Sequence, residues 1–451
     1  MNIKLDSRKI NKGDTFVAIK GINRDGHDYI DAAIKNGAIK IIAEYGNYSV
    51  ETLIVENTKK YLSNYLKDTY KEVLNGIKFI GITGTNGKTT SSFLIYQLLN
   101  KLGLKTAYIG TIGFYINNTF KVLDNTTPEI TDLYEIFIEC FNKGVKVIVM
   151  EVSSQAIDYG RVDGLTYDIG CFTNLTQDHL DYHITMDNYK KAKLEMFKNL
   201  RGEKLAILNK DDPNYKYFML DNNNILYGES SDNYKIEDCK LDMTHSEFNI
   251  NLYGTKYNIY LPLPGKYNVY NYMNAFIVAL NLNFDINDII NKTKELKSPD
   301  GRYETFYYNN SVIIVDYAHS PDAVETILKS VNEYKKGKVY TILGCGGNRD
   351  KTKRPIMGKI SVSNSDYVIF TNDNPRFEKP EDIMDDIVSR LEENNYEIVY
   401  NRREAIERGI KYLNKNDVLL ILGKGHEQYQ EIEGVKNHFS DKEEVLKIIK
   451  E

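Results

Sequence analysis

One short segment constrains the fold of this 451-residue chain more than any other feature. It is the run Gly84-Thr85-Asn86-Gly87-Lys88-Thr89-Thr90. The apolar stretch FIGIT precedes it and the helical pattern SSFLIYQLLNKLG follows it, so the run joins a strand to a helix. A glycine-rich turn in this place directs backbone N–H groups and a helix N-terminus at an anion. We therefore predict an ATP site in which Lys88 neutralises the β- and γ-phosphates and the Thr89 hydroxyl binds Mg²⁺.

The run departs from the strict P-loop pattern at one position. That pattern has glycine at position 82, where this chain has Ile82. An ordinary glycine-rich turn before a helix is the alternative interpretation, but the strand–loop–helix context favours a nucleotide site. The loop does not by itself specify which reaction follows nucleotide binding.

Alternating strand and helix patterns predict the architecture around this loop. The runs VKVIVMEV and KLAILN, separated by helical segments, indicate a largely parallel sheet covered on both faces. The runs SVIIVDYA, VYTILG, DYVIFT and DVLLILG indicate a second doubly wound unit. Short strands and one helical stretch before the loop indicate a small α/β unit. We predict an α/β fold with three domains: a small N-terminal domain at residues 1–76, a central P-loop ATPase-like domain at 77–297, and a C-terminal Rossmann-like domain at 298–451.

Composition excludes several classes of protein. A net charge of -5 and a pI near 5.9 argue against general binding to nucleic acid or to acidic membranes. The four cysteines form no C-x-x-C pair, which argues against zinc and against a disulfide framework. No run of about twenty apolar residues could span a bilayer, and the first residues lack the layout of a signal peptide. We expect a cytoplasmic protein, without membrane insertion, that works as a monomer on small molecules.

Several longer motifs follow one another in the order of a known family. They are GTNGKTT, MEVSS, FTNLTQDHLDYH, YKKAKLEMF, LNKDD, GRYE and VDYAHSPDA, with LDSRKINKGDTFVAIKG before them and DNPR and GKGHEQYQ after them. On these motifs the chain resembles the Mur ligase family, ATP-dependent enzymes of peptidoglycan biosynthesis. The terminal motifs resemble those of the family members that add the third residue of the peptidoglycan stem.

Three further residues are candidates for phosphate chemistry beside Lys88. Glu151 ends an apolar strand, where a carboxylate can reach Mg²⁺ beside nucleotide phosphates. The resemblance implies that His179 binds a second Mg²⁺ and that Lys193 is carbamylated, which turns a cation into an anion able to bind metal. Without the resemblance, His179 would be interpreted as a hydrogen-bonded loop histidine and Lys193 as a surface lysine.

The resemblance also implies nucleotide contacts from the third domain. Arg302 and Asp316 match family positions that contact ATP, and the planar fork of an arginine suits phosphate oxygens. Asn268 and Asn271 match an ordered turn before a helix. Helix capping accounts for these two equally well, so we leave them out of the predicted site.

Substrate contacts are implied in all three domains. The muramoyl-peptide positions of the family are matched by Asn125, Thr126, Thr127, Ser153 and Arg161, and a uridine-nucleotide contact by Ser7. Positions that hold meso-diaminopimelate are matched by Asp373, Asn374, Pro375, Arg376, Arg349, Gly423 and Glu427. Diaminopimelate carries a distal carboxylate and amine that an arginine and a carboxylate can read. Lysine lacks that carboxylate and would leave the arginine unpaired.

The resemblance thus implies a defined reaction. ATP would activate UDP-N-acetylmuramoyl-L-alanyl-D-glutamate as an acyl-phosphate, and meso-2,6-diaminopimelate or a related diamino acid would be joined to it. The alternatives are a lysine-adding enzyme, a folylpolyglutamate-type ligase, and a regulatory protein that binds ATP without ligation. Three departures from the family pattern, Gln155, Tyr159 and Asn401, bear on the peptide contacts and on the identity of the added amino acid.

Overall fold

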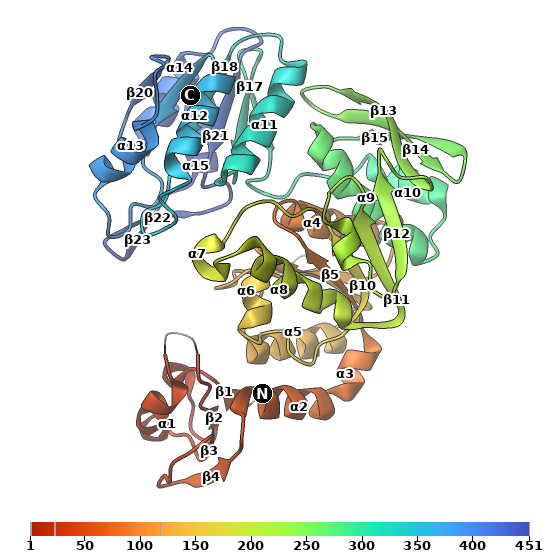
Figure 1. The fold of residues 1–451 in the computed structure, drawn as a ribbon, viewed down its shortest axis with the longest axis vertical. Coiled ribbons are helices and arrows are strands. Elements are labelled where there is room, and N and C mark those ends of the chain that lie inside the picture. The colour runs from red at the N-terminus through yellow and green to blue at the C-terminus, as the bar shows by residue number, and fades with distance from the viewer. Residues whose placement is uncertain (1, 22–23, 118, 451) are drawn as a thin grey trace.

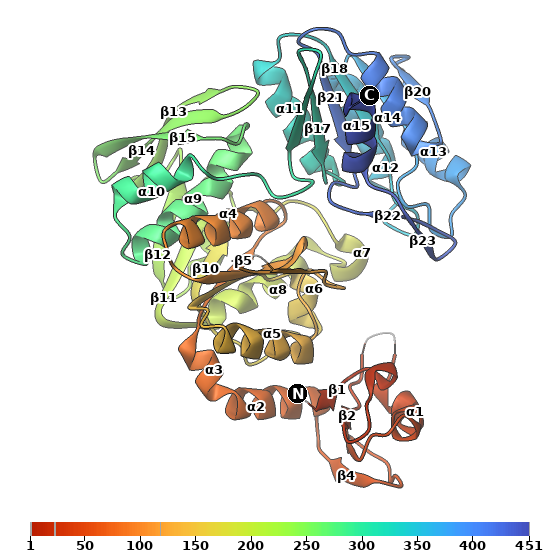
Figure 2. The same cartoon turned by 180° about the vertical axis from the view of Figure 1, so that it is seen from behind.

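The computed structural model describes residues 2–21, 24–117 and 119–450 as three α/β units. The N-terminal and C-terminal units lie at opposite ends of the central unit (Figures 1 and 2). The three main sheets have four, eleven and six strands. These parallel-sheet units confirm the predicted fold class. Among the helices of the described ranges, none is long and apolar enough to cross a membrane.

The N-terminal unit is a small, wholly parallel sheet. Its strands are β1 (Ile3–Lys4), β2 (Thr15–Val17), β3 (Lys40–Ala43) and β4 (Glu51–Ile54). Its helices are η1 (Ser7–Lys9), η2 (Gly26–Tyr29) and α1 (Ile30–Lys35). Phe16, Ile30 and Ile41 are buried between sheet and helix and form its core. Helices α2 (Thr58–Thr69) and α3 (Lys71–Gly76) lead from it to the central unit.

The central sheet places the P-loop strand between parallel neighbours. In spatial order its strands are β15 (Thr255–Leu261), β14 (Ser246–Leu252), β13 (Tyr234–Leu241), β12 (Asn223–Gly228), β11 (Leu200–Asn209), β10 (Tyr167–Phe172), β5 (Lys78–Thr83), β9 (Val147–Glu151), β6 (Thr106–Gly110), β7 (Gly113–Ile116) and β8 (Thr119–Lys121). The pairs from β13 to β6 are parallel, while both ends of the sheet finish in antiparallel strands. Strand β5 is apolar on both faces because helices cover both.

Helices of the central unit pack on opposite faces of this sheet. Apolar residues of α5 (Ile130–Asn142) and α8 (Met186–Lys198) are buried on one face. Those of α4 (Lys88–Lys101) and α9 (Lys266–Asn281) are buried on the other (Figure 1). The remaining helices are α6 (Ser154–Asp158), α7 (Leu180–His183), η3 (Tyr215–Phe218) and α10 (Ile286–Thr293). Because α4 starts directly after the P-loop, its N-terminus faces the carboxyl edge of the sheet.

The C-terminal unit is doubly wound. Its strands run in the order β16 (Glu304–Tyr308), β17 (Ser311–Asp316), β21 (Val418–Leu422), β18 (Val339–Leu343), β19 (Tyr367–Phe370) and β20 (Tyr396–Ile398), with only β16 antiparallel. One face carries α11 (Pro321–Tyr334), α12 (Arg354–Asn364) and α13 (Pro380–Val388), and the other α14 (Arg402–Lys411) and α15 (Asp441–Lys450). The hairpin of β22 (Tyr429–Ile432) and β23 (Val435–His438) follows β21.

Asn401 has a structural explanation. It is the N-cap of α14, and its side-chain oxygen accepts from the backbone N–H groups of Arg403 and Glu404. Asparagine and aspartate cap helices about equally well. The departure from the more common Asp therefore preserves the local structure.

Candidate active site

The P-loop has the backbone that an anion site requires. Gly84 has a φ of +148° and Gly87 a φ of +83°. A Cβ on Gly84 would lie 1.9 Å from Thr173 Oγ1, so only glycine fits there. Lys88 Nζ donates to the carbonyl oxygens of Gly84 at 2.9 Å and of Thr85 at 2.7 Å. The ammonium group is therefore held inside the loop, where phosphate oxygens would lie.

Glu151 is a buried acceptor for four donors. It is the last residue of β9 and its side chain is fully buried. Oε1 accepts from the Tyr108 hydroxyl at 2.6 Å and from the Thr111 N–H at 2.9 Å. Oε2 accepts from the hydroxyls of Thr89 at 3.0 Å and Thr111 at 3.1 Å. The carboxylate thus directly contacts the P-loop threonine that was predicted to bind Mg²⁺.

Lys193 is not a surface residue. It is 1% exposed, and its Nζ donates to the Gly84 carbonyl at 2.8 Å and lies 4.3 Å from the centre of the Tyr189 ring. Burial, reinforced by the positive charge of Lys88, holds the pKa of Lys193 well below its usual value. The surface interpretation is therefore wrong, because α8 directs this side chain under the P-loop.

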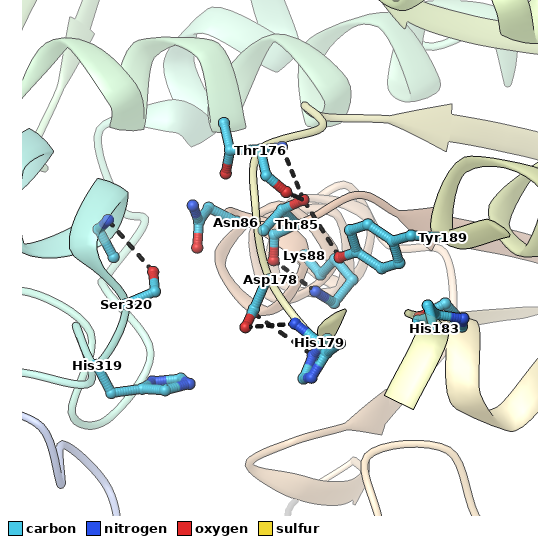
Figure 3. A network of polar contacts seen from close by, with 12 residues as sticks. Thr85, Asn86, Lys88, Thr176, Asp178, His179, His183, Tyr189, His319 and Ser320 are labelled. Carbon is cyan, nitrogen blue, oxygen red and sulfur yellow. Dashed lines mark hydrogen bonds and ion pairs between the residues drawn. The ribbon is translucent and has the colours of Figure 1, made fainter. Parts of the chain in front are cut away.

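A polar loop after β10 completes this side of the site. Asp178 Oδ2 lies 3.5 Å from His179 Nε2, and Figure 3 shows the two side chains beside Lys88. Burial would raise the pKa of Asp178, but His179, His319 and Lys353 outweigh that effect and the pKa is lowered. His319 approaches from the C-terminal unit (Figure 3), and burial lowers its pKa to about 4. The loop after β10 therefore places the Asp178 carboxylate near the side-chain nitrogens of His179, His319 and Lys353.

Two cavities meet at the P-loop. The first, of about 250 Å³, is lined by the predicted catalytic and muramoyl-peptide residues and by the P-loop residues after Gly84. Its lining includes Thr85, Asn86, Gly87, Lys88, Thr89, Thr90, Asn125, Thr126, Thr127, Glu151, Ser153, Arg161, His179, Lys193 and Arg302. The second, of about 450 Å³, lies between the central and C-terminal units and is lined by Asn86, Gly87, Arg302, Asp316 and the start of α11, among others. Phosphates at the P-loop would thus lie between the two cavities.

Arg302 and Asp322 make hydrogen bonds between the C-terminal unit and the central unit. Arg302 Nη2 donates to Thr89 Oγ1 at 3.3 Å. Asp322 Oδ2, in the first turn of α11, accepts from Asn86 Nδ2 at 2.7 Å and from Thr176 Oγ1 at 3.2 Å. The C-terminal unit is therefore hydrogen-bonded to the P-loop itself.

The capping interpretation of Asn271 is wrong. Helix α9 has Gly265 at its N-cap and no side-chain cap bond. Asn271 Oδ1 instead accepts from Ser91 Oγ at 3.3 Å and would lie 2.3 Å from a Cβ on Gly87. Asn268 bonds the Pro264 carbonyl at 2.8 Å, and both asparagines line the larger cavity. Helix α9 thus turns the Asn271 amide toward Gly87 of the P-loop, while the Asn268 amide donates to the turn before the helix.

Three of the predicted muramoyl-peptide residues, Thr127, Ser153 and Arg161, are joined by hydrogen bonds. Thr127 Oγ1 donates to the Glu151 carbonyl at 2.8 Å and accepts from the Ser153 N–H at 3.2 Å. Arg161 donates to the Thr127 carbonyl at 3.2 Å and lies 5.3 Å from the ring centre of Tyr159. Tyr159, where a polar residue is common, therefore packs on the guanidinium of Arg161.

The predicted amino-acid positions form a second group, which we call the C-terminal charged cluster: Arg349, Asp373, Asn374, Pro375, Arg376, Gly423 and Glu427. Asp373 and Gly423 follow the carboxyl ends of strands β19 and β21, which flank β18 in the sheet. Arg376 donates to the Gly347 carbonyl at 2.7 Å and lies 3.3 Å from Glu431. A Cβ on Gly346 would lie 2.9 Å from Arg376 Nη1 and 3.7 Å from Arg349 Cγ, so both arginines approach one loop.

Glu427 already has a cationic partner inside the protein. The buried Lys424 donates to Glu427 Oε2 at 2.8 Å and to Asn374 Oδ1 at 3.1 Å. Asn374 Nδ2 also donates to Glu427 Oε2 at 2.8 Å. The C-terminal charged cluster is not among the residues described as lining the two cavities. Ser7 is not among them either; it is buried in the N-terminal unit, with 7% of its surface exposed.

Several residues of the site were missed from the sequence. Asp178 stands next to His179 and Lys424 lies within GKGHE, so both were within reach of motif reasoning. Asp322 lies within the motif VDYAHSPDA and was also within reach, whereas Tyr108 lies in an apolar strand, where no pattern marks it.

The fold and this site together define a class: a three-unit α/β protein with a P-loop of the nucleotide-binding kind. Family models place the chain more narrowly. The Mur ligase family catalytic domain matches residues 1–83, the Mur ligase middle domain residues 82–279, and the Mur ligase glutamate ligase domain residues 301–425. The chain belongs to the Mur ligase family, which confirms the expected ATP-dependent ligase of peptidoglycan biosynthesis.

Individual relatives cover almost the whole chain. The UDP-N-acetylmuramoyl-L-alanyl-D-glutamate–2,6-diaminopimelate ligase 1 of Clostridium acetobutylicum is 40% identical over 462 positions, covering 100% of this chain and 95% of the relative. The corresponding Bacillus cereus ligase is 39% identical, covering 98% and 92%. A solved ligase of the same name superposes with a TM-score of 0.70 at 30% identity, covering 100% and 94%. The ADP complex of MurF ligase from Thermotoga maritima shares the fold, with a TM-score of 0.70 at 20% identity, covering 99% and 96%.

Proposed function

We propose that this chain joins meso-2,6-diaminopimelate, or a related diamino acid, to UDP-N-acetylmuramoyl-L-alanyl-D-glutamate through an acyl-phosphate. One observation carries the proposal: a single cavity brings Lys88, Glu151 and Lys193 together with the muramoyl-peptide positions around Arg161. The names of the two relatives at 39–40% identity support the choice of substrates.

The nucleotide would lie with its phosphates on the P-loop. Lys88 would exchange its two carbonyl partners for phosphate oxygens, and Arg302 would reach the same oxygens from the C-terminal unit. These cations stabilise charge that develops on the transferred phosphoryl group. Asp316 is the family position for a further nucleotide contact, and it lines the larger cavity.

The residues present fit Mg²⁺. Glu151 is a buried carboxylate 3.0 Å from the Thr89 hydroxyl, and both are hard oxygen donors of the kind that Mg²⁺ prefers. His179 would hold a second ion. Within the described ranges no three His, Cys, Asp or Glu side chains gather as a metal cluster, so phosphate oxygens and a carbamate would complete both sets. Bound Mg²⁺ would supply Lewis-acid stabilisation of phosphate charge.

Lys193 has the properties that carbamylation needs. Its lowered pKa favours the neutral amine, whose lone pair attacks the carbon of CO₂; loss of one proton from nitrogen leaves the carbamate anion. If Lys193 were protonated, its ammonium group and that of Lys88 would repel each other beside Gly84, whereas a carbamate on Lys193 would attract Lys88. The modification would therefore replace repulsion by an ion pair and add oxygen ligands.

Thr127, Ser153 and Arg161 would hold the substrate so that its terminal carboxylate faces the γ-phosphate. The incoming amine then attacks the acyl-phosphate carbon, and phosphate leaves. Water has to be excluded because it would hydrolyse the acyl-phosphate. The C-terminal charged cluster lies outside both cavities, so we infer that this unit moves to deliver the amine.

Phosphate release by the purified protein tests the proposal. We expect release only when UDP-N-acetylmuramoyl-L-alanyl-D-glutamate and a diamino acid are both present, with meso-diaminopimelate preferred over lysine and lanthionine. Turnover with a folate and glutamate instead would favour the folylpolyglutamate alternative, whose Mycobacterium tuberculosis representative shares only the fold at 16% identity. Equal turnover with lysine would change the amino acid and leave the ligase assignment intact.

We also propose the boundaries 1–76, 77–297 and 298–451 for the three domains, a cytoplasmic location and a monomeric state. Breaks between sheets at residues 54–78 and 261–304 support the boundaries. Limited proteolysis would test them by cleaving near residues 77 and 298. Light scattering in solution would test the monomer, since a mass twice the calculated 52.0 kDa would contradict it.

A further inference from the structure

Tyr108 makes a buried hydrogen bond with Glu151. Both side chains are fully buried, and the phenol donates to Glu151 Oε1 at 2.6 Å. A Cβ on Gly110 would lie 2.2 Å from Glu151 Oε1 and 2.3 Å from the Tyr108 hydroxyl oxygen. Gly110 thus leaves the space that lets the two groups meet, and any larger residue would displace one of them.

The Tyr108 ring cannot easily turn away from this contact. Phe93, Tyr96 and Tyr115 surround it, with ring centres 5.5, 6.3 and 5.9 Å from its own. Such edge and tilted contacts fix an aromatic side chain in one orientation. The hydroxyl is therefore a rigidly placed donor.

The two oxygens of Glu151 differ in the donors they face. A carboxylate oxygen has two in-plane acceptor positions. On Oε1 both are taken by groups that cannot rotate away: the packed phenol and the backbone N–H of Thr111. On Oε2 the partners are the hydroxyls of Thr89 and Thr111, which can turn their protons elsewhere. Only Oε2 can therefore turn a lone pair to a cation without breaking a fixed hydrogen bond.

We propose that Tyr108 is a positioning residue that makes Glu151 a monodentate metal ligand through Oε2 and so favours Mg²⁺ over Ca²⁺. Mg²⁺ requires six ligands at short, nearly octahedral positions, whereas Ca²⁺ takes six to eight and accepts bidentate carboxylates. With Oε1 held by two donors, the second oxygen that Ca²⁺ would use is not available. The inference rests on the proposed metal role of Glu151.

Metal binding to the ADP complex tests this with Tyr108→Phe, which removes one oxygen and keeps the ring. Tyr96→Phe is the matched control, because its hydroxyl bonds the Asn117 carbonyl at 3.2 Å in the same aromatic cluster. Displacement of Mn²⁺, followed by electron paramagnetic resonance, gives affinities for Mg²⁺ and Ca²⁺ without turnover. Loss of an outer-shell partner should weaken Mg²⁺ binding about tenfold in Tyr108→Phe, with a smaller loss for Ca²⁺. Tyr96→Phe should match the parent.

Two outcomes would overturn the inference. In the first, a folded Tyr108→Phe protein binds Mg²⁺ and Ca²⁺ as the parent does, which refutes the positioning role of Tyr108. If Glu151→Gln loses metal binding in the same assay, the proposed metal role of Glu151 still holds. Parental binding in Glu151→Gln would remove both. Should Tyr108→Phe not fold, a crystal structure of the parent with ADP and Mg²⁺ decides: Oε2 alone on the metal supports the inference, and a bidentate Glu151 refutes it.

Discussion

Asp322 is a carboxylate of the C-terminal unit that accepts two hydrogen bonds from the central unit, one of them from the P-loop. Its Oδ2 accepts from Asn86 at 2.7 Å and from Thr176 at 3.2 Å, and both donors belong to the central unit. A hydrogen bond to a charged acceptor contributes about 1.5–3 kcal/mol, and partial exposure reduces the pair here to about 2 kcal/mol in total. Since 1.4 kcal/mol is a factor of ten, Asp322→Ala should shift the equilibrium between joined and separated units about 30-fold.

Small-angle scattering and steady-state kinetics would measure this shift. We expect Asp322→Ala to increase the radius of gyration of the unliganded protein and to lower kcat/KM for ATP by up to about 30-fold. Thr176→Val removes the longer bond alone and should give an intermediate effect. Glu325→Ala is the matched control: it lies in the same helix and pairs only with Lys329 among the ion pairs of the described residues. Parental scattering and kinetics in Asp322→Ala would refute the reasoning.

Three substitutions and one titration also test the site. Lys88→Ala should abolish ADP formation and leave the melting temperature nearly unchanged, because the hydrogen bonds described for its ammonium group go to carbonyls of its own loop; near-parental ADP formation would contradict the phosphate role. Lys193→Ala should abolish ligation, with partial rescue by added short carboxylates, and mass spectrometry or density without a carbamate on active parent protein would contradict the modification. His319 should be neutral at pH 6 by nitrogen NMR, because its pKa is about 4 and protonation begins only as the pH falls toward that value; a titration near 6.5 would contradict the burial argument. Arg376→Ala should raise the KM for diaminopimelate about 10- to 100-fold with little change for ATP, since a charge-assisted contact contributes about 1.5–3 kcal/mol; an equal rise for ATP would argue against a specific role.

Periodicity and turn chemistry predicted the fold because they are local. The run FIGIT became β5 (Lys78–Thr83) and SSFLIYQLLNKLG became most of α4 (Lys88–Lys101), since an apolar strand, two glycines and an apolar helix agree with one another. Motif resemblance placed Glu151 and Lys193 in one cavity although they are 42 positions apart. Composition alone could not have done so, because a buried lysine and a surface lysine have the same sequence appearance.

The roles of Tyr108 and Asn271 could not be predicted from the sequence, because they depend on contacts between elements that are distant in the chain. Tyr108 in β6 looks like any apolar strand residue, and only the neighbouring position of β9 brings Glu151 to its hydroxyl. Asn271 looked like a capping residue because it stands near a helix start, yet the helix begins at Lys266 and turns its amide to the P-loop. In both cases a side chain acquires its role from the element packed against it.

The groups for phosphoryl transfer and the predicted amino-acid positions lie in different units of the protein. The P-loop, Glu151 and Lys193 are preorganised within the central unit, but the C-terminal charged cluster is outside their cavity. Two of its charges are paired with neighbouring residues, Glu427 with Lys424 and Arg376 with Glu431. Charges paired in this way can remain buried without a ligand, whereas unpaired buried charges could not. A diamino acid carries both ammonium and carboxylate groups. These groups can replace the present partners of Glu427 and Arg376 at little net electrostatic cost. Amino-acid binding would then be separable from phosphoryl transfer, and Asp322 and Arg302 are the described contacts through which the two steps would be coupled.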